Sequence, residues 1–252
     1  MGSAGFGNLA SVMTSQQPAV RILAPAKLTT ELSVTGIRED GMHEIDAEMV
    51  TLDFYDELLV TPGATGVSIV GDANAVIDPD DNLITRAAKL AGVEIGVELH
   101  KHIPAGAGLG GGSADAAAVL RWAGFTDVER AATIGADVAF CLVGGRARVR
   151  GIGEIVEPLT FVARTFTIVT PPIHCSTPAV YSKWDEMGGP VGDNGNDLEP
   201  AALAVAPALA QARDDLGDTT GLTPRLAGSG SSWFVEGAFP EAGSVHRTIE
   251  AQ

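Results

Sequence analysis

Residues 104–117 of this 252-residue chain read PAGAGLGGGSADAA, and five of the first twelve are glycine. The preceding stretch, residues 93–103, alternates as a half-buried strand does, with Val93, Ile95, Val97 and Leu99 on one face. The following stretch, residues 116–122, is rich in alanine and has high helix propensity. The sequence therefore predicts a strand that leads through a glycine-rich loop into a helix.

This predicted loop is suited to bind phosphate. Glycine has no Cβ, so several consecutive backbone N–H groups can turn inward. The N-terminus of the following helix adds roughly half a positive charge. A flexible linker is the alternative interpretation, but a linker is not expected between a periodic strand and an Ala-rich helix. The loop lacks the Gly-Lys-Ser/Thr of a Walker A motif and does not fit a dinucleotide-binding GxGxxG pattern.

The charge of the chain limits its partners. Sixteen Lys and Arg residues stand against 32 Asp and Glu residues, which gives a formal net charge of −16. Such a charge opposes binding to the phosphate backbone of nucleic acids, so no nucleic-acid partner is expected. An anionic ligand is expected only where a local feature overrides this field, and the glycine-rich loop is such a feature.

The remaining composition indicates a globular cytoplasmic protein. The two cysteines, Cys141 and Cys175, form no CxxC pair, and reduced thiols are expected. No stretch approaches 18 uninterrupted apolar residues, and we expect no membrane partner. Residues 1–17 are small, polar and rich in Gly and Ser, and we expect a disordered extension there.

The periodic stretches predict a mixed α/β protein. Asn82 provides N-cap chemistry for a helix over 83–90 that Gly92 ends, and Thr177-Pro178 begins another helix. The pattern of predicted elements changes near residue 160. We therefore place a domain boundary there, between domains at 18–160 and 161–252. Further helices are predicted at 127–134 and 201–216, and strands at 20–23, 32–35, 48–52, 57–61, 67–70, 147–149, 154–158 and 166–169.

Several motifs resemble those of one kinase superfamily. The stretch 104–117 resembles the second motif of the GHMP kinases, which phosphorylate small molecules. Residues 227–231 (AGSGS) resemble the third motif. The first motif, PAK at 25–27 followed by GIREDGMH at 36–43, is similar to that of the branch that acts on CDP-methylerythritol. Matches to this branch continue at GADVAF (135–140), GG (144–145), GIGE (151–154) and NDLE (196–199), in the same order along the chain.

The resemblance implies a two-domain α/β (α+β) fold. An N-terminal nucleotide-binding domain and a ferredoxin-like C-terminal domain would enclose the active site between them. The implied activity is ATP-dependent phosphorylation of the 2-hydroxyl of CDP-methylerythritol, a step of the non-mevalonate route to isoprenoids. ATP and Mg²⁺ are the implied cofactors, and the protein is expected to be a monomer or a homodimer.

The resemblance also implies the residues that act on ATP. Asp137 would be the base, and Lys27 would lie near it, favour its ionised form and counter charge on the transferred group. Ser113 would contact phosphate or Mg²⁺ through its hydroxyl, with simple N-capping as the alternative. Taken alone, Lys27 is also consistent with an exposed strand residue and Asp137 with a helix cap. The implied ATP-binding residues are Asn82, Lys101, Pro104, Ala105, Gly106, Ala107, Gly108, Leu109, Gly110, Gly111, Gly112, Ser113 and Ala114.

The implied substrate pocket departs from the pattern of the branch. The branch stacks the cytosine between two aromatic rings, and here Tyr181, after Thr177-Pro178, keeps the second ring while Met42 replaces the first. His43 would read the edge of the base. Thr29 stands where an Asn is usual, and Ala114 where a second Ser is usual.

The sequence is also consistent with two other functions. One is a GHMP kinase for a different alcohol, and the other is a catalytically weakened GHMP-fold binding protein. The presence of Lys27 and Asp137 favours an enzyme, because a binding protein needs neither. His100 and His102 share a strand face, but no third ligand is apparent, so we assign no zinc site.

Overall fold

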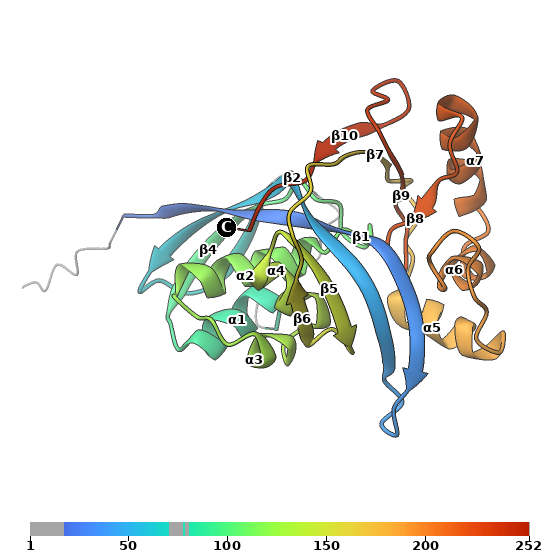
Figure 1. The fold of residues 1–252 in the computed structure, drawn as a ribbon. Coiled ribbons are helices and arrows are strands. Elements are labelled where there is room, and N and C mark those ends of the chain that lie inside the picture. Colours follow the sequence, from blue (N-terminus) through green and yellow to red (C-terminus); the bar gives the residue numbers. More distant parts are fainter. Residues whose placement is uncertain (1–17, 71–77, 79–80, 252) are drawn as a thin grey trace, which may run out of the picture.

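A long antiparallel hairpin runs through the molecule. The computed structural model describes residues 18–70, 78 and 81–251, so the predicted extension at 1–17 lies outside the described residues. Strands β1 (Val20–Ile37) and β2 (His43–Pro62) pair along almost their whole length (Figure 1). The prediction of two short strands in each was wrong. Pro25 lies at a register shift, where the missing proline N–H does not interrupt the strand.

The first sheet is built around β2. Strand β4 (Ile95–His100) pairs with the second half of β2, β5 (Arg146–Gly151) pairs with the first half, and β1 lies along the opposite edge. β3 (Val67–Val70) runs parallel to β4, and β6 (Ile155–Pro158) pairs with β5. Helices α1 (Leu83–Ala91), α2 (Gly111–Trp122), α3 (Val128–Ala132) and α4 (Ala136–Val143) cover one face of this sheet (Figure 1).

The second sheet is antiparallel, in the order β10 (Ser244–Arg247), β7 (Thr165–Val169), β9 (Trp233–Glu236) and β8 (Arg225–Leu226). Helices α5 (Thr177–Glu186), α6 (Glu199–Val205) and α7 (Leu209–Thr220) lie on its side of the molecule (Figure 1). The single helix predicted at 201–216 was wrong, because Pro207 separates α6 from α7. The chain passes to the second sheet between Pro158 and Thr165, and the domain boundary near residue 160 stays a prediction.

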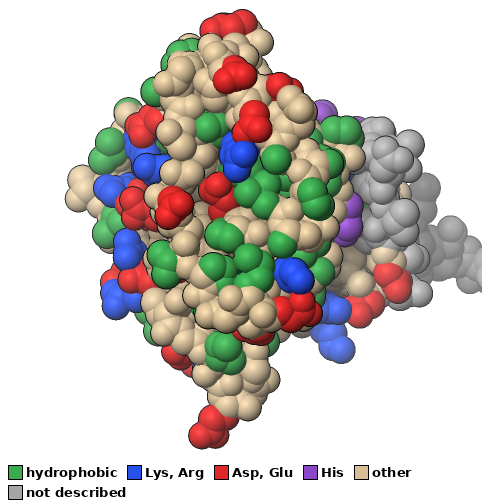
Figure 2. Space-filling model, turned by 90° about the vertical axis from the view of Figure 1, so that its right-hand side faces the viewer, with side chains coloured by type: hydrophobic (Ala, Val, Ile, Leu, Met, Phe, Trp, Pro, Cys, Tyr) green, Lys and Arg blue, Asp and Glu red, His purple; other side chains and the backbone are tan. Residues whose placement is uncertain are grey.

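The surface over α5, α6 and α7 carries mixed charges. Figure 2 views this side and shows Lys and Arg side chains scattered among acidic and apolar ones. Of the helices in the described part of the chain, none is long and apolar enough to cross a membrane.

A shared apolar cluster joins the two sheets. Leu28 of β1 and Val50 of β2 are buried there with Phe166 of β7 and Phe234 of β9. The rings of Phe166 and Phe234 meet edge to face, with their centroids 5.7 Å apart. Leu109, from the glycine-rich loop, is buried in the same cluster. Burial of one loop residue between the sheets therefore fixes the position of the loop relative to both.

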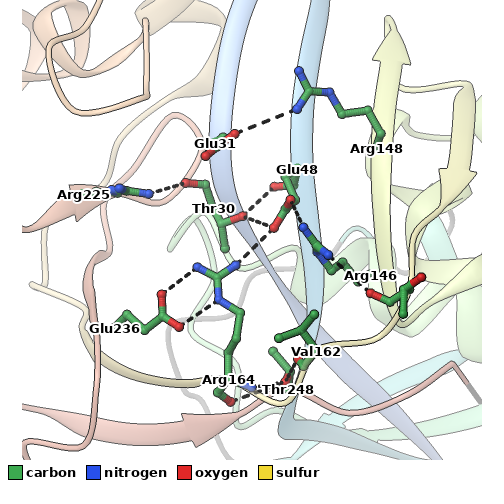
Figure 3. Close-up of polar contacts among 11 residues, drawn as sticks. Thr30, Glu31, Glu48, Arg146, Arg148, Val162, Arg164, Arg225, Glu236 and Thr248 are labelled. Carbon is green, nitrogen blue, oxygen red and sulfur yellow. Dashed lines mark hydrogen bonds and ion pairs between the residues drawn. The ribbon is translucent and has the colours of Figure 1, made fainter.

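A charged network joins the same strands (Figure 3). The buried Glu48 of β2 accepts hydrogen bonds from Arg146 of β5 at 2.6 Å and from Arg164, just before β7, at 3.1 Å. Arg164 also forms a bidentate ion pair with Glu236 of β9. Burial alone would raise the pKa of Glu48, but the hydrogen bond from Arg146 and the charges of both arginines outweigh it and lower the pKa. The network therefore links both sheets.

The NDLE segment links β1 to the loop before β9. The buried Asn196 donates from Nδ2 to the carbonyls of Leu226, at 2.8 Å, and Gly228, at 2.7 Å. Its Oδ1 accepts from the backbone N–H of Leu198 at 2.9 Å. The next residue, Asp197, accepts from the N–H of Val34 in β1 at 2.9 Å. These bonds give the segment a structural role in holding residues 226–228.

We therefore expect Asn196→Ala to destabilise the fold. The change leaves two carbonyls and one N–H buried without their partners, at a cost of about 1–3 kcal/mol each before relaxation. Denaturant unfolding should show a loss of about 2–4 kcal/mol. Gln211→Ala, which removes an exposed amide hydrogen bond on α7, is the control and should change stability by about 0.5 kcal/mol or less. Equal stabilities of the two variants would contradict this role.

Candidate active site

One large cavity collects most of the predicted site residues. Its volume is about 860 Å³, and it lies between β1, the glycine-rich loop, α4 and α5. The predicted site residues that line it are Lys27, Thr29, Met42, His43, Lys101, Pro104, Ala105, Gly106, Ala107, Gly108, Gly110, Gly111, Gly112, Ser113, Asp137, Thr177 and Tyr181. Asn82, Leu109 and Ala114 are outside this lining.

The glycine-rich loop is held from two sides. Lys27 of β1 donates its backbone N–H to the carbonyl of Leu109 at 3.0 Å, and Ser232 donates to the carbonyl of Ala107 at 3.1 Å. Gly108 has a φ of +77°, and a Cβ there would lie 2.3 Å from the carbonyl oxygen of Ala227. The loop therefore contacts the 227–232 segment so closely that position 108 excludes any side chain.

Helix α2 begins inside the loop, five residues before the predicted start at Ala116. Gly110 is its N-cap with a φ of +69°, and its carbonyl accepts the first helical hydrogen bond, from Ala114 at 2.8 Å. The N–H groups of Gly111, Gly112 and Ser113 therefore have no acceptor within the helix. All three residues line the cavity, whereas the side chains of Leu109 and Ala114 are buried. The helix therefore presents backbone donors to the cavity.

Lys27 and Asp137 meet in this cavity. The Lys27 side chain is buried, and its Nζ lies 3.1 Å from Oδ2 of Asp137 and 3.0 Å from Oγ1 of Thr29. A Cβ at Gly110 would lie 2.7 Å from Cγ of Lys27, so this glycine makes room for the lysine stem. Asp137 is partly exposed in the first turn of α4.

The turn between β5 and β6 fixes the start of α4. A Cβ at Gly153 would lie 2.8 Å from the carbonyl oxygen of Ala136, so the turn packs directly on the first helical residue. Glu154 accepts a hydrogen bond from the N–H of Ile152 at 2.6 Å and closes the turn. The GIGE motif thus sets the position of Asp137 through backbone packing.

Lys101, one of the implied ATP-binding residues, lines the cavity but is held by two carboxylates. Its Nζ is buried between Asp56 of β2 and Asp115 of α2, at 3.1 Å from Asp115 Oδ2. Burial raises the pKa of Asp115 to about 7, against the attraction of Lys101, and the nearby Asp56 adds to the rise. Asp56 also accepts from the N–H groups of His102 and Ile103. This ion cluster lies directly beneath the first turn of α2, since a Cβ at Gly111 would lie 2.9 Å from Nζ.

Asn82 is the N-cap of α1. Its Oδ1 accepts from the N–H of Thr85 at 2.9 Å, and the Thr85 hydroxyl accepts from the N–H of Asn82 at 3.1 Å. The neighbouring Leu83 lines the cavity, and its Cδ1 would lie 3.6 Å from a Cβ at Gly112.

An aromatic corner forms the other end of the cavity. The ring centroid of His43, at the start of β2, lies 4.6 Å from that of Tyr181 and 5.7 Å from that of Trp184, both on α5. Burial raises the pKa of the Tyr181 phenol, and the charge of Asp137 adds to the rise. Met42 also lines the cavity but is 47% exposed.

Two residues of this corner were not predicted from the sequence. His43 Nε2 lies 2.8 Å from Oδ1 of Asp185, and the Thr177 hydroxyl lies 2.8 Å from that of Ser229. Asp185 follows Tyr181 by four residues, a spacing that puts both on one helix face and was the available signal. Ser229 belongs to the AGSGS motif, which was assigned no individual residues.

The chain is similar in sequence to known proteins. Residues 82–145 match the model of the GHMP kinases N terminal domain. The 4-diphosphocytidyl-2-C-methyl-D-erythritol kinase of Paracoccus denitrificans is 38% identical over 234 residues, which cover 85% of each chain. The corresponding protein of Ruegeria pomeroyi is 35% identical over 92% of each chain.

The structure is also similar to solved structures. A crystal structure of 4-(cytidine 5'-diphospho)-2C-methyl-D-erythritol kinase is 30% identical with a TM-score of 0.73, covering 92% of this chain and all of the other. Homoserine kinase from Cytophaga hutchinsonii, 18% identical with a TM-score of 0.63, shares the fold. The predicted two-domain α/β fold is confirmed. With this identity over most of each sequence, the chain belongs to the 4-diphosphocytidyl-2-C-methyl-D-erythritol kinase family of GHMP kinases.

Proposed function

We propose that this protein transfers the γ-phosphoryl group of ATP to the 2-hydroxyl of CDP-methylerythritol. The observation that carries the proposal is the Lys27–Asp137 pair, 3.1 Å apart, in a cavity that has the N-terminus of α2 at one side and an aromatic corner at the other. One end of this cavity suits a triphosphate and the other suits a nucleobase. The pair between them suits the transfer.

The triphosphate would bind to the glycine-rich loop and the first turn of α2. The free N–H groups of residues 111–113 and the helix dipole provide positive potential in a chain of net charge −16. The backbone of residues 104–110 provides further donors and space that Cβ atoms would fill. The adenosine would then lie toward Leu83 and the buried Lys101.

The transfer itself would use two side chains. Asp137 accepts the proton of the attacking hydroxyl, and the Lys27 ammonium offsets negative charge on the transferred group. Thr29 orients Lys27 through its hydrogen bond. Mg²⁺ usually keeps few protein ligands beside nucleotide phosphates, so one hydroxyl, that of Ser113, fits such a site, and the ion would neutralise phosphate charge.

The cytidine would occupy the aromatic corner. Tyr181 would stack on the base, Met42 would pack on its other face, and His43 would read its edge. Thr177, held by Ser229, would contact the substrate beside them. We further propose that the protein is cytoplasmic, that it is a monomer or a homodimer, and that its two domains meet near residue 160.

This function predicts both a substrate preference and the effect of losing the catalytic pair. ADP release should be fast with CDP-methylerythritol and near background with homoserine or mevalonate. Asp137→Asn and Lys27→Ala should each lower turnover by about 10² or more, because a positioned base or a charge stabiliser is lost. Glu129→Gln, an exposed acid on α3, is the control and should retain full turnover. Normal turnover in folded Asp137→Asn would refute the base, and a preference for another alcohol would refute the substrate.

A second prediction concerns the loop. Gly110→Ala should weaken ATP binding about tenfold or more, because an L-residue resists its positive φ and a Cβ would displace Lys27. Calorimetry with ATP measures this. The control is Gly217→Ala in α7, where φ is helical and the nearest atoms are 3.4 Å from the added Cβ. Unchanged ATP affinity in Gly110→Ala would mean that the triphosphate binds elsewhere.

The third prediction concerns the aromatic corner. Tyr181→Ala should raise the KM for CDP-methylerythritol about tenfold or more, since stacking on a base contributes roughly 1–3 kcal/mol. Tyr181→Phe keeps the ring and should stay near the wild-type KM. Met42→Tyr should lower KM, because it adds a second aromatic face. If Tyr181→Ala leaves KM unchanged, or if methylerythritol phosphate without the nucleotide reacts equally well, the cytidine pocket is misplaced.

A further inference from the structure

The ring of His43 is held in one orientation by α5. Its side chain is only 11% exposed, although it lies at the turn end of the β1–β2 hairpin, directly after residues 38–42. The rings of Tyr181 and Trp184 pack against it, with centroid distances of 4.6 and 5.7 Å. Trp184 is itself anchored, because its Nε1 donates to the carbonyl of Pro190 at 2.9 Å. The imidazole therefore has little freedom to turn.

Asp185 contacts one of the two ring nitrogens of His43. Its Oδ1 lies 2.8 Å from His43 Nε2, and both side chains line the cavity. A carboxylate only accepts hydrogen bonds, so Nε2 must be the donor. A neutral imidazole has one N–H, and Nδ1 is then a bare acceptor. Within the described part of the chain, Nδ1 has no hydrogen-bond partner, so it remains available to a ligand.

This acceptor distinguishes between the two pyrimidine bases. Cytosine carries a 4-amino group, which donates a hydrogen bond, whereas uracil carries a 4-oxo group, which only accepts. An Nδ1 without a proton accepts a hydrogen bond from the 4-amino group of cytosine. Against the 4-oxo group of uracil, two lone pairs would face each other and no hydrogen bond would form. Without a fixed tautomer the same histidine would pair with either base.

We propose that Asp185 is a positioning residue that holds His43 in the Nε2–H tautomer, so that Nδ1 accepts from the 4-amino group of cytosine and the site selects cytidine over uridine nucleotides. The inference rests on the proposed function, because it takes His43 as the residue that contacts the base. It adds a residue outside the family motifs quoted above and a reason for the choice of base. The tautomer alone decides which base is favoured, and the Nε2–H form favours cytosine over uracil.

The first test measures the tautomer without any ligand. Nitrogen-15 NMR of the histidine rings in the full chain, with the His43 signals identified by their loss in His43→Gln, should show the Nε2–H form at neutral pH. Asp185→Ala should give a mixture of the two tautomers, whereas Glu186→Gln, an exposed acid next to it on α5, should not change the spectrum. An Nδ1–H form in the wild type, or an unchanged tautomer in Asp185→Ala, would overturn the proposal.

The second test measures selection. Calorimetry compares CDP with UDP while a non-hydrolysable ATP analogue fills the ATP site. The wild type and Glu186→Gln should favour CDP by about tenfold or more, the range for one mispaired buried polar group. Asp185→Ala should lose most of this preference, mainly through weaker CDP binding. Asp185→Asn, whose amide oxygen can still accept from Nε2, should keep part of it.

The two possible failures are distinguishable. If the wild type shows the Nε2–H tautomer but does not bind CDP, the proposed function fails at its substrate and the selection fails with it. If the wild type binds CDP tightly and Asp185→Ala keeps the full preference over UDP, the proposed function stands and the role of Asp185 is wrong.

Discussion

The approach of Gly108 to the carbonyl of Ala227 is the contact on which the rest of the site depends. It brings the glycine-rich loop of the first sheet against the 227–232 segment of the second, closer than any side chain would allow. Backbone bonds from Lys27 to Leu109 and from Ser232 to Ala107 fix the register on both sides. Because Lys27 and the start of α2 are attached to this same loop, one packing constraint places both the cation and the helix N-terminus at the cavity.

The second requirement is local positive potential in an acidic protein. Long-range repulsion from a net charge of −16 is screened over about 10 Å in salt, whereas groups inside the cavity act at short range. Those groups are the Lys27 ammonium and the free N–H groups of α2. The other lysine of the cavity lining, Lys101, is paired with two buried carboxylates and so contributes to the support of the helix. The backbone and one lysine therefore provide most of the attraction for phosphate.

The sequence predicted the motifs better than the partners of their residues. Glycine-rich stretches and alternating strands depend on local chemistry, so the loop, α1 and β7 could be predicted. Lys27 and Asp137 were singled out by their resemblance to the family motifs and not by local chemistry. The pairing of His43 with Asp185 crosses 142 residues, and that of Lys101 with Asp56 crosses 45, so no local pattern could reveal them. The continuity of β1 through Pro25 was missed for a related reason, since it depends on a bulge that β2 accommodates. Asn196 lies within a motif, but only the fold shows that its amide binds the 226–228 backbone.

The most direct measurement is phosphorus-31 NMR of the product formed from ATP and CDP-methylerythritol. The carbon that bears the 2-hydroxyl also bears the methyl branch and has no hydrogen. Transfer to that oxygen predicts one new phosphomonoester signal without coupling to a carbinol proton, while the two diphosphate signals of the CDP group remain. A coupled phosphomonoester signal, which reports transfer to a different hydroxyl, would contradict the proposed reaction, as would the absence of any new signal.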